Sequence, residues 1–182
     1  MLASRAQQVA EFYIGRLHAD VERAEIAGSL RRGSGTVKDA EIVAIPKVQP
    51  DLFGDAYGEC RLHRVIVEAV DEGLLRWRAE THGKPQAFRT TPRKYYALVD
   101  VQSGCPVDLF VVRPPAQWGA IMAIRTGPAD YSRMLVTKCR EQGLVCKDGR
   151  LMNGAGETVP TPTEEAFFEA CGVAYVRPER RR

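Results

Sequence analysis

The feature that most restricts the fold of this chain is a pair of acids, Asp39 and Glu41, at the start of an apolar run that ends at Ile45. Successive side chains of a β-strand alternate between its faces, so the two acids share one face while Ile42 points to the other. Two neighbouring carboxylates repel each other, and one takes up a proton unless a cation compensates them. Mg²⁺ prefers carboxylate oxygens together with waters and substrate phosphates. The pattern therefore predicts a strand with a core face and a metal-binding face.

A glycine-containing turn precedes the acid pair. The apolar run 24–27 predicts a strand, which Gly28 and Ser29 follow as a turn and a short helix. A helix N-terminus offers unpaired N–H groups to a phosphate, Ser29 adds a hydroxyl, and Arg32 adds a guanidinium fork. Each part alone also fits a solvated loop or the wet face of an edge strand. Their joint spacing favours a site for a nucleoside triphosphate and a metal ion.

The sequence Gly28-Ser29-x-Arg31-Arg32-Gly33, with an acid pair that begins at Asp39, resembles the nucleotidyltransferase signature of DNA polymerase beta and the family X polymerases. The resemblance implies a third carboxylate on a neighbouring strand, and Asp108 in the apolar run 105–114 fits this position. It implies that Asp39, Glu41 and Asp108 are the catalytic residues and bind two Mg²⁺ ions, for which Mn²⁺ can substitute.

The same resemblance implies further nucleotide-binding residues. Arg125, Thr126 and Gly127 resemble the turn that lies beneath the nucleotide sugar, and Arg133 stands where the family has a stacking lysine. Together with Gly28, Ser29 and Arg32, the region of Lys38 is expected to hold the β- and γ-phosphates.

The chain also departs from polymerase beta. Glu41 stands where that enzyme has an aspartate, and Pro106 replaces an arginine two residues before the third aspartate. The sequence begins directly at the expected palm, so we expect a short form without the N-terminal lyase domain, similar in layout to the short viral family X polymerases.

The expected fold class is α+β. Residues 1–114 are expected to form a polymerase beta-like nucleotidyltransferase palm, a mixed sheet with helices on one face, and residues 115–182 a small α+β nucleotide-binding lobe. Ser4 and Gln7 predict a capping box for the first helix, Gly73 the end of the second, and Thr163 the start of the last. Helices are predicted at 4–19, 62–70, 118–124, 129–141 and after 163, and strands at 24–27, 38–45, 74–81, 94–101, 106–112 and on both sides of 147–149.

The formal net charge is only +3, but positive charge is concentrated in one stretch of the sequence. Between Arg76 and Lys94 six basic residues accompany the single acid Glu80, and aromatic residues are interleaved with them. Such a stretch can follow a nucleic-acid backbone without reading its sequence, although a solvated strand face is the plainer alternative. The residues predicted to contact DNA are Lys84, Arg89, Arg93 and Lys94.

Composition excludes some locations. The chain has no apolar run long enough to span a bilayer and no apolar signal region after Met1. Its five cysteines are odd in number and form no C-x-x-C pair, so we expect reduced thiols. We therefore expect an intracellular protein, cytoplasmic or nucleoid-associated, that is monomeric and neither secreted nor bound to membranes.

The expected function is template-directed DNA synthesis, in which dNMP from a dNTP is added to the 3′-hydroxyl of a primer and pyrophosphate is released. Gap filling in repair or replication is the expected setting, with primer-template or gapped DNA as partner. Two alternatives remain: a template-independent or RNA- or protein-directed nucleotidyltransferase, and an inactive nucleic-acid binding module.

Overall fold

The computed structural model describes residues 1–47, 61–78, 93–114 and 116–182. The chain divides into two compact units. Unit 1 consists of Met1–Ile26 and Gly35–Val111, and unit 2 of Ala27–Ser34 and Val112–Arg182. The turn that carries Ser29 therefore belongs to a different unit from the acid pair that follows it.

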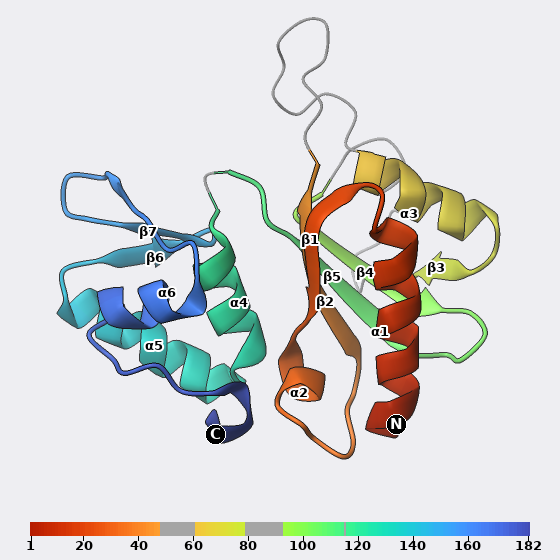
Figure 1. Ribbon diagram of the computed structural model, residues 1–182, viewed down its shortest axis with the longest axis horizontal. Helices are drawn as coiled ribbons and strands as arrows, with labels where there is room; N and C mark the ends of the chain where they lie inside the picture. The colour runs from red at the N-terminus through yellow and green to blue at the C-terminus, as the bar shows by residue number, and fades with distance from the viewer. Residues whose placement is uncertain (48–60, 79–92, 115) are drawn as a thin grey trace, which may run out of the picture. The chain divides into compact units, whose positions relative to one another are not determined.

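Unit 1 is built on a five-stranded mixed sheet with the order β1-β2-β5-β4-β3 (Figure 1). Its strands are β1 (Val21–Ile26), β2 (Ala40–Pro46), β3 (Leu75–Trp77), β4 (Tyr95–Asp100) and β5 (Pro106–Val111). β2 and β5 run parallel, and the other neighbours are antiparallel. The chain thus has the mixed α+β fold that was expected, and the pairing of β2 with β5 joins two strands that are distant in sequence.

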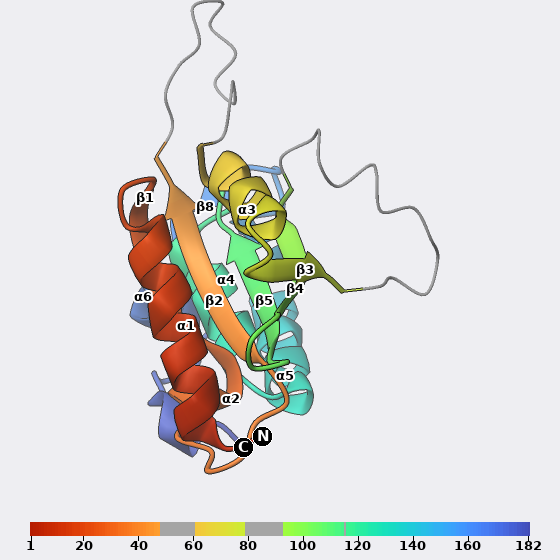
Figure 2. The same ribbon diagram turned by 90° about the vertical axis from the view of Figure 1, so that its right-hand side faces the viewer.

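Helices α1 (Ala3–Leu17) and α3 (Arg61–Asp71) cover one face of this sheet (Figure 2). On that face the hydroxyl of Tyr13 donates to Asp100 Oδ1 over 2.7 Å, and His63 Nδ1 lies 3.0 Å from the hydroxyl of Tyr96. Ile42 on β2 is buried on this side, and burial of such a side chain contributes about 1.5–3 kcal/mol. The opposite face carries Glu41 and Asp108, which are register partners.

The predicted capping box at Ser4 and Gln7 is wrong. α1 begins at Ala3, and its N-cap residue Leu2 makes no side-chain cap. Leu2 pairs instead with Thr36 as an isolated β-bridge, and the N–H of Ala3 donates to the carbonyl of Gly35 over 3.1 Å. A backbone carbonyl of the loop before β2 thus accepts from one of the first N–H groups of the helix, which a serine side chain would otherwise bind.

Unit 2 packs short elements around an apolar core. Its elements are α2 (Gly28–Arg31), α4 (Trp118–Thr126), α5 (Ala129–Glu141), α6 (Glu164–Ala170), the 3₁₀ helix η2 (Pro178–Arg180), and the strands β6 (Val145–Lys147), β7 (Arg150–Met152) and β8 (Thr158–Val159). The core includes Leu135, Phe167 and Phe168, all fully buried. The predicted start of the last helix is confirmed, since Thr163 Oγ1 accepts from the N–H of Ala166 over 3.2 Å.

None of the helices within the described ranges combines the length and the apolar character that a membrane crossing requires.

Candidate functional site

Two of the acids named from the sequence, Glu41 and Asp108, lie in one row across the sheet of unit 1. Glu41 on β2 is the register partner of Asp108 on β5, and Asp108 is in turn the partner of Ala97 on β4. The N–H of Arg78 donates to the carbonyl of Ala97 over 3.0 Å, which extends the β3–β4 pairing by one residue. The row therefore reads Glu41, Asp108, Ala97, Arg78, and we call it the acid row.

Asp39 lies directly before β2 and is half-buried. Burial raises the pKa of its carboxyl, repulsion by Asp108 raises it further, and Arg78 and Lys38 oppose these effects. Asp39 is thus close enough to Asp108 for their charges to interact. The structure sets Glu41 beside Asp108 and places Asp39 within electrostatic reach of Asp108, and the catalytic role of all three stays a prediction.

Asp108 is held by two side chains of neighbouring strands. Arg78 Nη2 donates to Asp108 Oδ1 over 2.5 Å, and the hydroxyl of Tyr95 donates to the same oxygen over 2.9 Å. Arg78 Nη2 also lies 2.6 Å from the hydroxyl of Tyr95, whose ring stacks on Phe110 with the centroids 5.0 Å apart. The sequence reasoning counted Arg78 only as one charge in a basic stretch and did not foresee this contact.

The donor chemistry of Asp39, Glu41 and Asp108 fits a divalent cation of the Mg²⁺ type, because these residues offer carboxylate oxygens and because Asp39 and Asp108 repel each other. Across the ranges that the structure describes, however, no group of three or more His, Cys, Asp or Glu side chains is arranged to hold a metal ion. Asp108 is turned to Arg78 instead. The two Mg²⁺ ions stay a prediction.

The expected phosphate-binding turn forms α2. Gly28 has a φ of +62°, a conformation that favours glycine, and Ser29 is half-buried. α2 spans only four residues, so its aligned peptide groups contribute little dipole at this turn. Individual N–H groups and the Ser29 hydroxyl remain as phosphate donors.

A cluster of buried polar groups ties α2 to the rest of unit 2. Arg31 donates to Thr126 Oγ1 over 2.9 Å and to Glu164 Oε2 over 2.6 Å. Arg181 donates to Glu164 Oε1 over 2.6 Å. We call these four residues the Glu164 network. Arg32 is bound beside it, since its Nη1 donates to the carbonyl of Thr126 over 2.6 Å.

This network bears on residues predicted from the sequence. Thr126 is fully buried with its hydroxyl bonded to Arg31, so only its backbone is placed to line a nucleotide site. Arg32 uses one nitrogen on a backbone carbonyl. Arg181 is buried, which nothing in the sequence pattern of the C-terminal end indicates.

The other predicted nucleotide-binding residues lie on the surface of their units. Lys38 and Arg125 are exposed, and Gly127 is half-buried at the end of α4. Arg133 is exposed on α5 and forms an ion pair with Asp130.

The predicted DNA-contacting residues are only partly visible. Lys84 and Arg89 lie outside the described residues. Lys94 is exposed. Arg93 is half-buried, and its N–H donates to the hydroxyl of Tyr96 over 3.0 Å.

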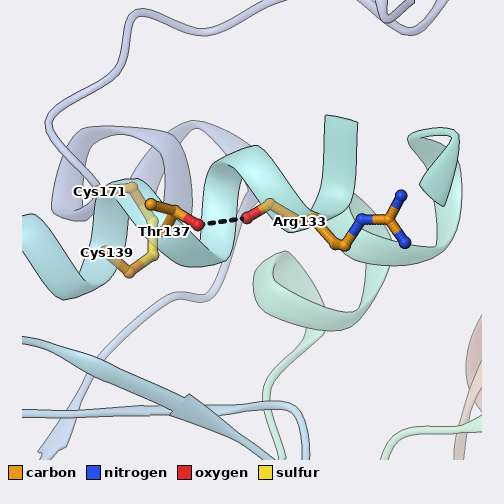
Figure 3. The surroundings of a disulfide bond; sticks show 4 residues. All are labelled: Arg133, Thr137, Cys139 and Cys171. Carbon is orange, nitrogen blue, oxygen red and sulfur yellow. Dashed lines mark hydrogen bonds between the residues drawn. A yellow bond between two sulfur atoms is a disulfide. The ribbon is translucent and has the colours of Figure 1, made fainter. Parts of the chain in front are cut away.

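Cys139 on α5 and Cys171, which follows α6, form a disulfide (Figure 3). The expectation of reduced thiols is wrong for this pair, because the ends of two helices bring both residues into one core. No spacing motif in the sequence indicates this pairing. Among the described residues Cys105 and Cys146 are free, and burial raises the pKa of both thiols. Disulfides are rare in cytosolic proteins, so the cysteines no longer favour an intracellular location.

Figure 3 also shows α5 beyond this disulfide. Thr137 Oγ1 donates to the carbonyl of Arg133 over 3.0 Å, and the guanidinium of Arg133 points away from the sulfur atoms. The residue predicted to contact the nucleotide and the disulfide therefore lie at different positions along one helix.

The C-terminal part of the chain is similar to a known protein family. Residues 121–182 match the family model for the DNA polymerase beta thumb. No curated protein matches the chain. The matched segment covers most of unit 2, from within α4 to the C-terminus, and this part of the protein is similar to the thumb of DNA polymerase beta.

Proposed function

We propose that this protein is a template-directed DNA polymerase that adds dNMP to a primer 3′-hydroxyl, with gap filling as its task. The observation that carries the proposal is the thumb match over residues 121–182 in a chain that also sets Glu41 opposite Asp108. The thumb match alone indicates similarity to a DNA polymerase but not catalysis. The acid row adds carboxylates that could bind metal ions and accept a proton. Together they support a nucleotidyltransferase palm in unit 1 and a nucleotide-binding lobe in unit 2.

In this proposal Asp108 accepts the proton of the primer 3′-hydroxyl, because a carboxylate on a sheet face can act as general base. Asp39, Glu41 and Asp108 would hold two Mg²⁺ ions, which when bound lower the pKa of that hydroxyl and neutralise phosphate charge. The attacking oxygen then displaces pyrophosphate from the α-phosphorus in line.

The nucleotide contacts come from the turn and the lobe. The N–H groups at Gly28, the hydroxyl of Ser29 and the free donors of a cationic side chain such as Lys38 bind the β- and γ-phosphates. Arg32 is anchored at Thr126 and brings its positive charge to the same turn. The backbone of Thr126 and Gly127 contacts the sugar, and Arg125 and Arg133 contribute positive charge near the nucleotide.

For DNA we propose electrostatic contacts from the basic stretch. Lys94 is exposed beside β4, and Lys84, Arg89 and Arg93 belong to the same run of positive charge. Such contacts hold a phosphate backbone without sequence preference and weaken with salt.

Primer extension on a gapped duplex tests the proposal. Each dNTP and each NTP is supplied separately with Mg²⁺ or Mn²⁺, and the wild type is compared with Asp108→Asn. Asp148→Asn is a matched control, because Asp148 is exposed and its φ of +53° is one that asparagine tolerates. We expect template-matched dNTP addition by the wild type and the control, and none by Asp108→Asn.

Two other results would decide for the alternatives. Addition that ignores the template identifies a template-independent nucleotidyltransferase, and addition to RNA or protein hydroxyls identifies another acceptor. Tight DNA binding without incorporation in either metal identifies a binding module, which the engagement of Asp108 by Arg78 would then explain.

A further inference from the structure

We propose that Arg78 is a positioning residue that acts as an internal counter-ion of Asp108 and competes with a divalent cation for this carboxylate. The inference rests on the proposed function, because it takes Asp108 to be a ligand of that cation. It adds a residue that the sequence reasoning had placed among general basic charges, and it assigns that residue a measurable effect on metal affinity.

Arg78 and Asp108 form a short, half-buried ion pair. The 2.5 Å contact joins Arg78 Nη2 and Asp108 Oδ1 across an intervening strand, at side-chain exposures of 36% and 13%. Arg78 can cross that strand because the residue between them in the acid row is Ala97, whose methyl group leaves the path open. The pairing is therefore set by sheet register and by a small side chain.

Asp108 Oδ1 is held in a fixed orientation by two donors. Tyr95 donates to the same Asp108 Oδ1, and its ring is held on Phe110. Two donors on one oxygen fix the rotation of the carboxylate, because charge-assisted hydrogen bonds are short and directional. A cation that uses Oδ1 must share it with these donors or displace them.

Arg78 also balances the negative charge of the acid row. Arg78 forms an ion pair with Asp108, which lies beside Glu41 in the sheet register, so one guanidinium compensates charge where two acids are neighbours. A divalent cation at these acids would supply the same compensation and would also be repelled by Arg78. The two cations are thus alternatives, and Arg78 raises the metal concentration needed for binding.

Mn²⁺ binding provides a test that does not depend on catalysis. Free Mn²⁺ is measured by electron paramagnetic resonance during titration of the wild type, Arg78→Met and Arg76→Met. Arg76 is exposed and lies two residues away, so its replacement removes the same charge without touching Asp108. We expect Arg78→Met to bind Mn²⁺ about tenfold more tightly than the wild type, and Arg76→Met to bind like it.

Tighter Mn²⁺ binding by Arg78→Met would show that Arg78 competes with the metal ion. If Arg78 only supported the fold of the site, its loss would loosen the acids and weaken Mn²⁺ binding. Unchanged or weaker binding by Arg78→Met overturns the inference. In the Asp108→Asn background the Arg78→Met change should have no effect on Mn²⁺ affinity, and a persistent gain there would show that Arg78 acts elsewhere.

Thermal unfolding covers the case in which Arg78→Met folds poorly. We expect this variant to unfold at a lower temperature than the wild type in EDTA, and to gain more from added Mn²⁺. Arg78→Lys keeps the charge and should bind Mn²⁺ with an affinity between the other two. An equal Mn²⁺-induced rise in all three proteins contradicts competition.

The test also separates this inference from the proposed function. If the wild type extends primers and Arg78→Met shows the affinity of the wild type, only the inference fails. If neither protein binds Mn²⁺, the metal-dependent function fails and the inference falls with it.

Discussion

Arg181 donates to Glu164 Oε1 over 2.6 Å, and the side chain of Arg181 is fully buried. The guanidinium also lies over the rings of Phe168 and Tyr175, 4.9 and 5.5 Å from their centroids. The second oxygen of Glu164 accepts from Arg31. One buried carboxylate thus links the C-terminal end of unit 2 to the turn that carries Ser29.

Arg181→Ala should strongly destabilise unit 2. The substitution leaves Glu164 buried with only Arg31 as cationic partner, and breaking a buried ion pair costs about 3–5 kcal/mol. Urea unfolding followed by far-UV circular dichroism measures the loss. Arg180→Ala is the control, because Arg180 is exposed. A change of equal size in both variants would show that the Glu164 network does not stabilise the fold.

Reduction of the Cys139–Cys171 disulfide should lower the free energy of unfolding by about 3–4 kcal/mol, the loop-closure value for a sequence separation of 32. Urea unfolding is measured with and without dithiothreitol. The double variant Cys139→Ser, Cys171→Ser should match the reduced wild type and be insensitive to dithiothreitol. A wild type that does not respond to the reductant would mean that the thiols are unpaired in solution.

Gly119→Ala should destabilise the packing of α4 against the segment before α6. A Cβ at Gly119 would lie 1.9 Å from the carbonyl oxygen of Thr163 and 2.6 Å from that of Thr161, and backbone atoms cannot yield as a flexible side chain does. We expect a loss of about 2–3 kcal/mol or more. In the control Gly154→Ala a Cβ meets nothing within 4 Å. Equal thermal midpoints for both variants would contradict the close approach.

The sequence predicted local features of this fold well. Strand alternation placed Glu41 and Ile42 on opposite faces, Thr163 caps α6 as expected, and Gly73 adopts the left-handed conformation, with a φ of +73°, that ends the helix before it. These features depend on a few neighbouring residues. The family resemblance added Asp108, and register confirms its place beside Glu41 without testing its chemistry.

What the sequence could not provide are contacts set by distant residues. Arg78 contacts Asp108 because of the β3-β4-β5 register. Cys139 is bonded to Cys171 because two helices pack together. Arg181 forms a buried ion pair with Glu164. A charged residue in a basic stretch and a charged residue in a buried ion pair look alike in a sequence. Tertiary packing decides between them.

Asp39→Asn should make the protein more stable at neutral pH. Burial and repulsion raise the pKa of Asp39, so the folded state holds this proton more tightly than the unfolded chain does. The resulting stability is present below the unfolded-state pKa, about 4, and is lost as the pH rises through the raised folded-state value. Asparagine does not ionise, so the variant does not lose this stability as the pH rises.

Urea midpoints of Asp39→Asn and the wild type, measured in EDTA from acid to neutral pH, check this sign. The difference should be largest at neutral pH and shrink towards acid pH. Glu22→Gln, which replaces an exposed acid of the same unit, should show no such trend. A gain that is independent of pH would come from packing rather than from relief of charge.

Ala97→Leu should reproduce the effect of removing Arg78 without changing a charge. The larger side chain would stand between Arg78 and Asp108 in the acid row, so it should separate the two and leave Asp108 to a cation. We expect Mn²⁺ affinity to rise towards that of Arg78→Met, and the double variant to show little further gain, because both changes break one contact. Ala97→Ser keeps a small side chain and should bind Mn²⁺ like the wild type. If Ala97→Leu is folded by circular dichroism and its Mn²⁺ affinity is unchanged, the path of Arg78 over Ala97 does not control access to Asp108.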